Sequence, residues 1–409
     1  MPLDPSRTVA ELRELQELTG DADGAQRVAW TDTWVRAKDW LDEKVPLEVS
    51  LDEAGNQWWT LSGRSEKAVL IGGHIDSVPN GGWLDGALNL VAGVEVMRRL
   101  AEEGEPAVTV RLVNWADEEG ARFGRSLFGS SAAAGSMGDQ EELRARRDAD
   151  GNSLPDVLAE HGVDLDQASE ANLENAAAYL ELHIEQGPVL ESLDLPLGVV
   201  LGTFGVERHQ VTFRGQAAHA GSTPMDKRRD ALAGAAKLEL EIREIAKRTG
   251  GGAVCTMGSV VTKPGIVTSV VETAECLLDQ RNLNAATLAS MLDEAKSASD
   301  RIAQEEDIDV EWERIWQIEP ILFDDELIEL ADESIREVAG TSHRLPSGPL
   351  HDAAEVSRAG VPTVMLFVQS VRGLSHTKLE DTKEEHLELA VQALDRLADR
   401  TIAWVASRS

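Results

Sequence analysis

Apolar and polar positions in the first part of the chain predict an alternation of helices and strands. A helix is predicted where apolar residues recur every three or four positions, and a buried strand where a short apolar run is uninterrupted. By these criteria the sequence predicts a helix over 27–43, a strand over 67–73, a helix over 87–103 and a strand over 108–115. Strands that alternate with helices are typical of an α/β fold, in which helices cover both faces of a mainly parallel sheet.

The pattern changes in the middle of the chain. Apolar and polar residues alternate over 206–216 and within 253–281, as in strands with one face in solvent, and a charged amphipathic helix over 227–248 separates them. We therefore expect a small α+β domain inserted into the first domain. The expected domains are a discontinuous first domain of residues 1–205 and 318–409 and an inserted domain of residues 206–317.

Two other segments complete the predicted fold. Residues 364–368 form an apolar run with the length of a strand, and we expect it to return to the first sheet. Residues 136–175 are polar and charged, which predicts surface helices with a loop near 148–151.

Composition narrows the classes of protein that fit the chain. Its 409 residues are 42% hydrophobic, as in globular proteins, and 39 Lys and Arg against 73 Asp and Glu give a formal charge of −34. So acidic a chain is a poor partner for nucleic acid or for an anionic membrane. No apolar run is long enough to span a membrane, no secretory signal is visible and the only cysteines are Cys255 and Cys276, so we expect a cytoplasmic protein.

Candidate chemistry begins in the glycine-rich segment 72–86. It places His74, Asp76 and Asp85 after a predicted strand, and the acidic run 117–119 follows the next strand. Ligands bind beyond the carboxyl ends of the strands in such sheets, so these side chains are expected at one edge. Because imidazole and carboxylate groups coordinate divalent ions such as zinc and manganese, this edge is predicted to hold a metal.

Five residues are candidate metal ligands. Any one of the nine histidines alone is best explained as a structural residue, but the candidates together favour a metal site. The candidates are His74, Asp85, Glu119, His183 and His376. Glu118 and Glu119 are adjacent, so their side chains point in different directions, and one can bind a metal while the other holds a water for hydrolysis. A solvated acidic turn would explain this pair if it stood alone.

Seven ordered segments resemble the hydantoinase/carbamoylase family of metal-dependent amidases, which is related to the aminoacylase-type metallopeptidases. The resemblance runs from about residue 8 to the C-terminus. The segments are GGHIDSVPNGGWLDG (72–86), ADEEGARFG (116–124), ELHIEQGPVLE (181–191), GQAAHAGSTPMD (215–226), LDQR (278–281), PSGPLHDA (346–353) and GLSHTKLED (373–381).

The resemblance implies a binuclear metal centre in which each residue has a distinct role. The five candidate ligands would hold two divalent ions (zinc, manganese, cobalt or nickel), with Asp85 as the bridge between them. Asp76 would orient His74, and Glu118 would act as the general base. The family also implies a homodimer formed through the inserted domain, which would serve as a lid over the substrate.

Four further residues match positions that face the substrate in the family. His219 lies in the inserted domain and would approach the substrate, often from the partner subunit; the others are Gln186, Arg281 and His351. Each of these three also has a plainer interpretation: a turn residue for Gln186, a surface ion pair for Arg281 and a helix start for His351. The chain departs from the family pattern at Trp83, Ala218, Thr268 and Leu350.

We therefore expect a hydrolase of linear C–N bonds, in the first place one that converts an N-carbamoyl-L-amino acid to the L-amino acid, ammonia and carbon dioxide. Allantoate, β-ureidopropionate, N-acyl amino acids and dipeptides stay open as alternative substrates, because no single residue selects among them. A non-catalytic binding protein on the same scaffold is the least favoured alternative, because all five candidate ligands and Glu118 are present.

Overall fold

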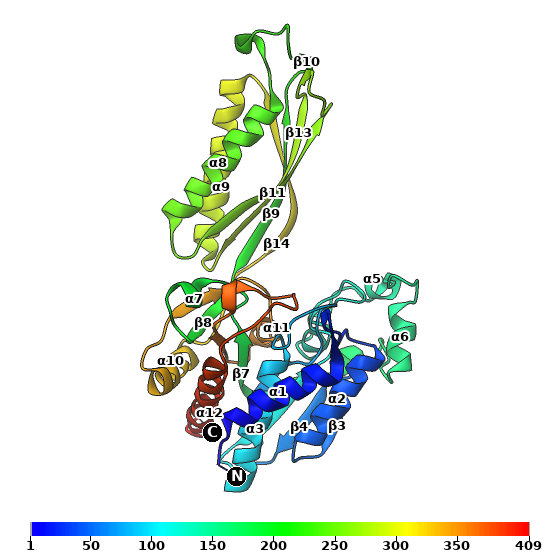
Figure 1. The fold of residues 1–409 in the computed structure, drawn as a ribbon, viewed down its shortest axis with the longest axis vertical. Coiled ribbons are helices and arrows are strands. Elements are labelled where there is room, and N and C mark those ends of the chain that lie inside the picture. The colour runs from blue at the N-terminus through cyan, green and yellow to red at the C-terminus, as the bar shows by residue number, and fades with distance from the viewer. Residues whose placement is uncertain (1, 409) are drawn as a thin grey trace. The chain divides into compact units, whose positions relative to one another are not determined.

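A mixed sheet of nine strands organises much of the computed structural model, which describes residues 2–408 (Figure 1). The strand order is β15 (Ile321–Leu322), β8 (Leu197–Thr203), β17 (Thr363–Val368), β7 (Ala176–Ile184), β5 (Ala68–His74), β6 (Thr109–Trp115), β4 (Gln57–Leu61) and β3 (Val49–Leu51), and β16 (Arg344–Ser347) pairs with β8. The central strands β17, β7, β5 and β6 are parallel. The predicted α/β class is confirmed, with antiparallel strands added at both sides of the parallel centre.

Helices cover both faces of this sheet (Figure 1). On one face lie α3 (Ala87–Glu103), α10 (Asp325–Ala339) and α12 (Glu384–Ala406), and α1 (Pro5–Thr19) packs on α3 and α12. On the other face lie α4 (Phe128–Ala133) and α11 (Asp352–Arg358). Apolar side chains from these helices and from both faces of the strands form one continuous core.

Other helices lie at the periphery. They are α2 (Asp32–Lys44), α5 (Gln140–Ala145), α6 (Leu154–Glu160) and α7 (Val189–Ser192). The prediction of surface helices over 136–175 is confirmed by α5 and α6, with a turn at 149–150 between them. Among residues 2–408, no helix combines the length and the apolar surface that a membrane span requires.

Local sequence explains where several elements begin and end. All seven residues of β5 are buried, as its uninterrupted apolar run predicts, and α3 coincides with the predicted helix over 87–103. The helix predicted over 27–43 begins only at Asp32. Thr31 keeps an extended backbone and its side chain accepts a hydrogen bond from the Trp34 N–H, so it is the N-cap and the preceding residues lie outside the helix.

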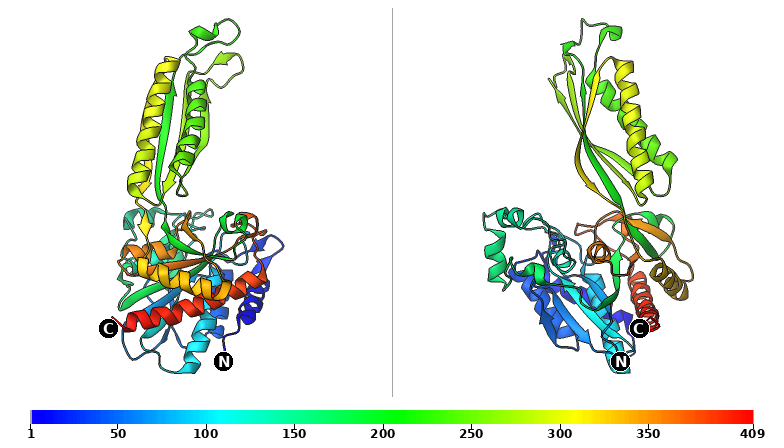
Figure 2. Two further views of the ribbon diagram at one scale, coloured as in Figure 1. Left: turned by 90° about the vertical axis from the view of Figure 1, so that its left-hand side faces the viewer. Right: turned by 180° about the vertical axis from the view of Figure 1, so that it is seen from behind.

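Contacts divide the chain into two compact units. One contains the segments up to Leu201 and from Phe323 onward, and the other contains Gly202–Leu322, which includes all of the expected domain 206–317. The second unit is built on an antiparallel sheet with α8 (Ala231–Thr249) and α9 (Ala285–Glu306) on one face (Figure 2). Its strand order is β11 (Val254–Lys263), β13 (Thr273–Asn282), β9 (Gly205–Arg214) and β14 (Asp309–Ile318). The sequence did not predict α9 or β14 as elements.

Candidate metal centre

Two candidate ligands stand at either end of the segment that follows β5. His74 is the last residue of β5 and Asp85 lies just before α3, so both come from the carboxyl edge of the parallel strands. Gly86, between Asp85 and α3, has φ +67°, and a Cβ at this position would lie 2.4 Å from the His74 ring. The chain can pass this close to His74 only because Gly86 has no side chain.

One group of donors is buried. Atoms of His74, Asp85 and His183 all lie within 4.8 Å of one another. Nε2 of His183 is 3.1 Å from Asp85 Oδ1, and Nε2 of His74 is 3.9 Å from the same oxygen. The other ring nitrogens face carbonyl oxygens: His74 Nδ1 is 3.2 Å from the Asp76 oxygen, and His183 Nδ1 is 2.9 Å from the Ile184 oxygen. Donation by Nδ1 to these carbonyls leaves Nε2 of both rings free to bind a metal.

A second group of donors shares Asp85. Atoms of Asp85, Glu119 and His376 also lie within 4.8 Å of one another. Nε2 of His376 is 3.5 Å from Asp85 Oδ2 and 3.4 Å from Glu119 Oε2. The two oxygens of Asp85 therefore face different groups, which is the arrangement that a bridging carboxylate needs. The His376 side chain is 50% exposed, whereas the side chains of Asp85 and Glu119 are 4% and 6% exposed.

Asp76 connects the two acidic segments of the centre. Its Oδ1 accepts a hydrogen bond from the Glu118 N–H at 3.2 Å, and its Oδ2 accepts one from the Glu119 N–H at 3.1 Å. The same Oδ1 lies 3.4 Å from His74 Nδ1. Asp76 thus holds the backbone of both glutamates as well as the imidazole of His74, a wider role than the sequence predicted.

The two glutamates are buried beside the histidines. Oε2 of Glu118 is 3.7 Å from His74 Nε2, and burial, partly offset by His74, holds the pKa of Glu118 well above its usual range. Burial and the neighbouring Asp85 raise the pKa of Glu119 to about 8. Oε1 of Glu119 has no hydrogen-bond partner among residues 2–408. An unpaired buried carboxylate oxygen is unfavourable, and a cation would supply the missing interaction.

Three polar side chains surround Asp85, of which the sequence predicted Gln186 and missed Ser375 and Glu380. The Ser375 hydroxyl donates to Asp85 Oδ2 at 2.8 Å, and Gln186 Nε2 donates to the same oxygen at 2.9 Å. Oε1 of Glu380 accepts hydrogen bonds from the N–H groups of Leu84 and Asp85, each at 3.0 Å. Ser375 and Glu380 both stand in the segment GLSHTKLED, but no spacing rule showed that they turn toward Asp85.

Two predicted substrate residues lie at this centre. Gln186 reaches it through Asp85, and the ring of His351 lies 4.4 Å from the ring of His183, centroid to centroid. His351 is buried, and its Nε2 lies 3.0 Å from the Ser347 hydroxyl. Burial, reinforced by the nearby His183, holds the pKa of His351 well below its usual range. Its imidazole is therefore neutral near pH 7 and can hydrogen-bond a polar group.

Trp83 has contacts of a structural kind. Its indole is 6% exposed and lies beneath the Arg13 guanidinium, which is 3.5 Å from the ring centroid. Its Nε1 donates to Asp381 Oδ1 at 3.3 Å. These contacts hold Trp83 in the core of the first unit, which counts against a role in substrate choice.

His219 and Arg281 belong to the second unit. His219 ends β10 (Ala218–His219), is exposed, and accepts a hydrogen bond at Nδ1 from the Gly221 N–H at 3.0 Å. Arg281 lies on β13 and donates to Asp279 Oδ1 at 2.7 Å, so it forms an ion pair of the kind that the plainer interpretation foresaw. Their contacts with a substrate stay predictions.

The donor set suits hard or borderline divalent cations. Imidazole and carboxylate donors without a cysteine are typical ligands of zinc, manganese, cobalt and nickel. The unpaired oxygen of Glu119 and the shared carboxylate of Asp85 both fit a cation between the donors. Glu118 lies beside these donors and is available to exchange a proton with a water there.

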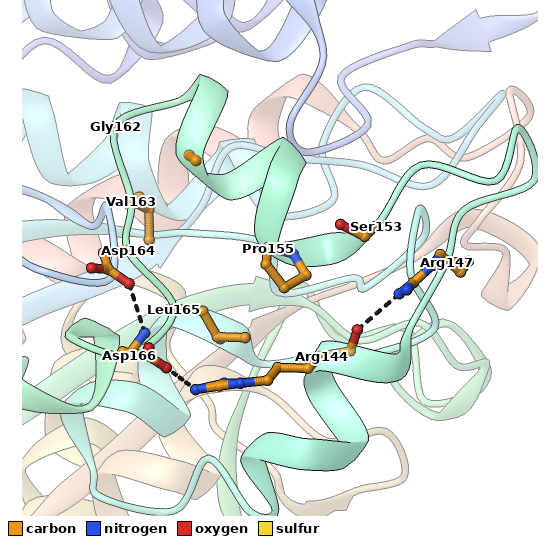
Figure 3. A pocket seen from close by; sticks show the side chains of 10 residues that line it. Arg144, Arg147, Ser153, Pro155, Gly162, Val163, Asp164, Leu165 and Asp166 are labelled. Atoms are coloured by element: carbon orange, nitrogen blue, oxygen red, sulfur yellow. Dashed lines mark hydrogen bonds and ion pairs between the residues drawn. The ribbon is translucent and has the colours of Figure 1, made fainter.

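A separate cleft lies on the surface near α5 and α6 (Figure 3). Its cavity volume is about 640 Å³, and Arg144 crosses it to form an ion pair with Asp166. Further lining residues are Arg147, Ser153, Pro155, Ala159, Gly162, Val163, Asp164 and Leu165. None of the predicted site residues lines this cleft, so it contributes nothing to the metal centre.

Comparison with known proteins places this geometry in context. The model of peptidase family M20/M25/M40 matches residues 70–400. An N-carbamoyl-L-amino acid amidohydrolase of Geobacillus stearothermophilus is 36% identical, with 91% of this chain and 92% of the relative covered. An allantoate amidohydrolase of Escherichia coli is 33% identical, with 94% of each chain covered. A crystal structure of an amidase of the hydantoinase/carbamoylase family from Burkholderia multivorans superposes with a TM-score of 0.87 at 30% identity and covers 97% of each chain.

Proposed function

The chain belongs to peptidase family M20/M25/M40, whose enzymes depend on metal ions, and on this premise we propose that it hydrolyses the linear C–N bond of an N-carbamoyl-L-amino acid. The overall reaction consumes water and yields the L-amino acid, ammonia and carbon dioxide. One observation carries the proposal: two groups of metal donors share Asp85, and Glu118 lies beside them.

Each side chain of the site has its own role in the proposed reaction. Two divalent ions bound to these donors would polarise the scissile carbonyl and acidify a water. Glu118 accepts the proton of the attacking water and returns it to the leaving nitrogen, while Asp76 fixes the Glu118 backbone. His351 hydrogen-bonds the substrate in its neutral form. His219 stabilises the oxyanion, and Arg281 binds the α-carboxylate with two parallel hydrogen bonds.

Allantoate is the second candidate substrate. The Escherichia coli relative, 33% identical over nearly the whole chain, is an allantoate amidohydrolase. Allantoate also carries ureido groups and a carboxylate, so the same donors and the same arginine would serve both substrates. The choice between them lies in the shape of the substrate pocket.

A purified-protein assay of ammonia release decides between these substrates. The metal-stripped protein is reconstituted with manganese, zinc or cobalt and given N-carbamoyl-L-amino acids, their D-enantiomers and allantoate; N-acetyl amino acids, which release acetate and no ammonia, are assayed by the appearance of the free amino acid. We expect the highest kcat/KM with an N-carbamoyl-L-amino acid. Turnover of allantoate alone would refute the first substrate and support the second.

The role of Glu118 is tested separately. Glu118→Gln removes the proton acceptor while keeping the size of the side chain, so we expect kcat to fall by about 10²- to 10⁴-fold with metal content unchanged. Glu95→Gln is the matched control, because Glu95 is also buried in the first unit but is paired with Arg7 outside the centre. Activity of Glu118→Gln equal to that of the control would remove Glu118 from its assigned role.

We also propose that the second unit forms a homodimer interface along β11. This strand is at the edge of its sheet, so its outer backbone groups can pair with another strand. Val254, Val261 and Leu277 lie on the sheet face opposite α8 and α9, and each is more than 40% exposed. An apolar face beside a free strand edge is suited to a second copy of the same chain.

Light scattering coupled to size-exclusion chromatography tests the dimer. We expect a mass of twice 44.3 kDa for the wild type and of one chain for Val261→Lys, because a lysine in the interface would have to be buried without a partner. Val189→Lys, at an exposed position of the first unit, is the control and should leave the mass unchanged. A wild-type monomer at all protein concentrations would refute the proposal.

A further inference from the structure

Arg27 is a fully buried arginine whose side chain enters the segment between His74 and Asp85. Its relative exposure is 0%, and it lies in the short connection between β2 (Gly24–Ala25) and α2, where the sequence predicted a helix. The carboxylates that face its guanidinium include Asp76 and Asp85. A guanidinium keeps its proton in proteins, so this is a permanent positive charge inside the first unit.

The guanidinium hydrogen-bonds both ends of the ligand segment. Nε of Arg27 donates to the Ile75 carbonyl at 2.7 Å, one residue after the ligand His74. Nη2 lies 3.5 Å from the carbonyl oxygen of the ligand Asp85 and donates to it. One rigid planar group therefore spans the start and the end of a segment that carries two metal donors.

The backbone of Arg27 binds the middle of the same segment. Its N–H donates to the Ser77 hydroxyl at 3.1 Å, and its carbonyl accepts from the Ser77 N–H at 3.1 Å. Two residues earlier, Ala25 exchanges a pair of backbone hydrogen bonds with Gly81, at 2.9 and 3.2 Å. The segment 25–27 thus runs alongside 77–81 and holds it from one side.

Stability alone does not explain this residue. Nη1 of Arg27 is buried and has no hydrogen-bond partner among residues 2–408, so its burial is incompletely compensated. An apolar side chain of similar length would avoid that cost. Buried polar groups that lower the stability of the folded protein are typical of functional sites, because such sites require a fixed geometry even at a cost in stability.

We propose that Arg27 is a positioning residue of the metal centre: by binding the Ile75 and Asp85 carbonyls at once, it fixes the separation of the ligands His74 and Asp85. The inference rests on the proposed metal function of these two residues. Arg27 contacts neither a substrate nor the ligating side-chain atoms of His74 and Asp85. It acts on these two residues through hydrogen bonds to the backbone. Its loss should therefore change how a metal is bound before it changes anything else.

Cobalt binding tests the proposal without reference to catalysis. The metal-stripped protein is titrated with Co²⁺; its visible absorption reports the coordination geometry, and competition with a chelator gives the affinity. The variants are Arg27→Lys, which keeps the charge but cannot span both carbonyls with one rigid group, Arg27→Met, which removes both, and Ser77→Ala, which removes one backbone contact. Arg99→Met is the control, because Arg99 is a nearly buried arginine that binds Asp395 on another helix.

We expect Arg27→Met and Arg27→Lys to weaken Co²⁺ binding about 10-fold or more and to alter the absorption spectrum. Ser77→Ala should show a smaller loss of the same sign, and Arg99→Met should lower the Tm with the spectrum and affinity unchanged. Wild-type affinity and spectrum in Arg27→Lys and Ser77→Ala would overturn the proposal even if Arg27→Met failed to fold. Absence of Co²⁺ binding by the wild type would instead refute the proposed metal function.

Discussion

Gly86 offers a sharp test of how tightly the metal centre is built. Substitution by alanine adds one methyl group, whose carbon would lie 2.4 Å from Cε1 and Nδ1 of His74 and 2.5 Å from the His74 carbonyl oxygen. Ordinary contacts between such atoms begin at about 3.5 Å. Rotation of the imidazole alone cannot relieve the contact, because the backbone oxygen of His74 is equally close.

Two costs add at this position. The backbone of Gly86 has φ +67° and ψ −51°, a conformation that costs an L-residue about 1–3 kcal/mol. Inserting a methyl group into a packed region costs about 1–3 kcal/mol more. The metal-free protein should therefore lose about 2–6 kcal/mol, which corresponds to a fall in Tm of about 4 °C or more for a unit of this size.

Gly135→Ala separates the two costs. Gly135 has φ +71°, but a Cβ there would meet no atom within 4 Å among the described residues, so this variant carries the backbone cost alone. We expect Gly86→Ala to lower the Tm more than Gly135→Ala does and also to weaken Co²⁺ binding, because His74 must move. Equal Tm values for the two variants together with wild-type metal affinity would refute the close approach of Gly86 to His74.

Three further predictions follow from the structure. His183→Ala removes a buried metal donor, and His376→Ala removes a half-exposed one. Metal analysis after dialysis should therefore show a larger loss of bound metal for His183→Ala than for His376→Ala. A larger loss for His376→Ala would contradict the unequal burial of the two donor groups. Dialysis against a strong chelator should abolish hydrolysis, and added Mn²⁺ or Zn²⁺ should restore it; full activity of chelated protein would exclude a metal-dependent reaction. Burial lowers the pKa of Lys38 to about 8, although the nearby Asp39 and Asp52 act to raise it. The unfolded state therefore binds more protons than the folded state between about pH 8 and 10.5, and the free energy of unfolding should rise with pH across that window. Plots of Tm against pH for the wild type and Lys38→Met that run parallel there would refute this prediction.

The strength of the apolar pattern explains most, but not all, of which elements were predicted from the sequence. β5 was predicted because it opens with an unbroken run of apolar side chains over 68–71, and α3 because apolar side chains recur at helical spacing along it. α9 was missed although Leu288, Met291, Leu292 and Ile302 recur at helical spacing on its buried face, so its pattern was readable in the sequence. β14 was missed because exposed apolar residues such as Trp316 blur its alternation.

Some residues of the candidate site were likewise predictable from their position in the sequence, and others were not. His74, Asp76 and Asp85 stand in one short segment after a strand, and that position alone predicted their meeting with the acidic run 117–119. The spacing of residues could not show that His376 and His183 both lie near the Asp85 carboxylate. The family resemblance alone predicted that both histidines are ligands of the same centre. Nothing local marked Arg27, because its contacts are with backbone carbonyls far along the chain.

The position of β17 bears on how the protein is made. This strand lies between β7 and β8, yet both of its neighbours begin before the second unit in the chain and β17 follows it. During synthesis, β7 and β8 must leave the ribosome with open edges and wait until the whole of Gly202–Leu322 has been translated before the sheet can close. His376 emerges later still, so a nascent chain carries an incomplete set of donors until it has been extended past that residue. We therefore expect a full set of donors only in chains that extend past His376, and chains that terminate before it to be substrates for chaperones and proteases rather than partly active enzymes.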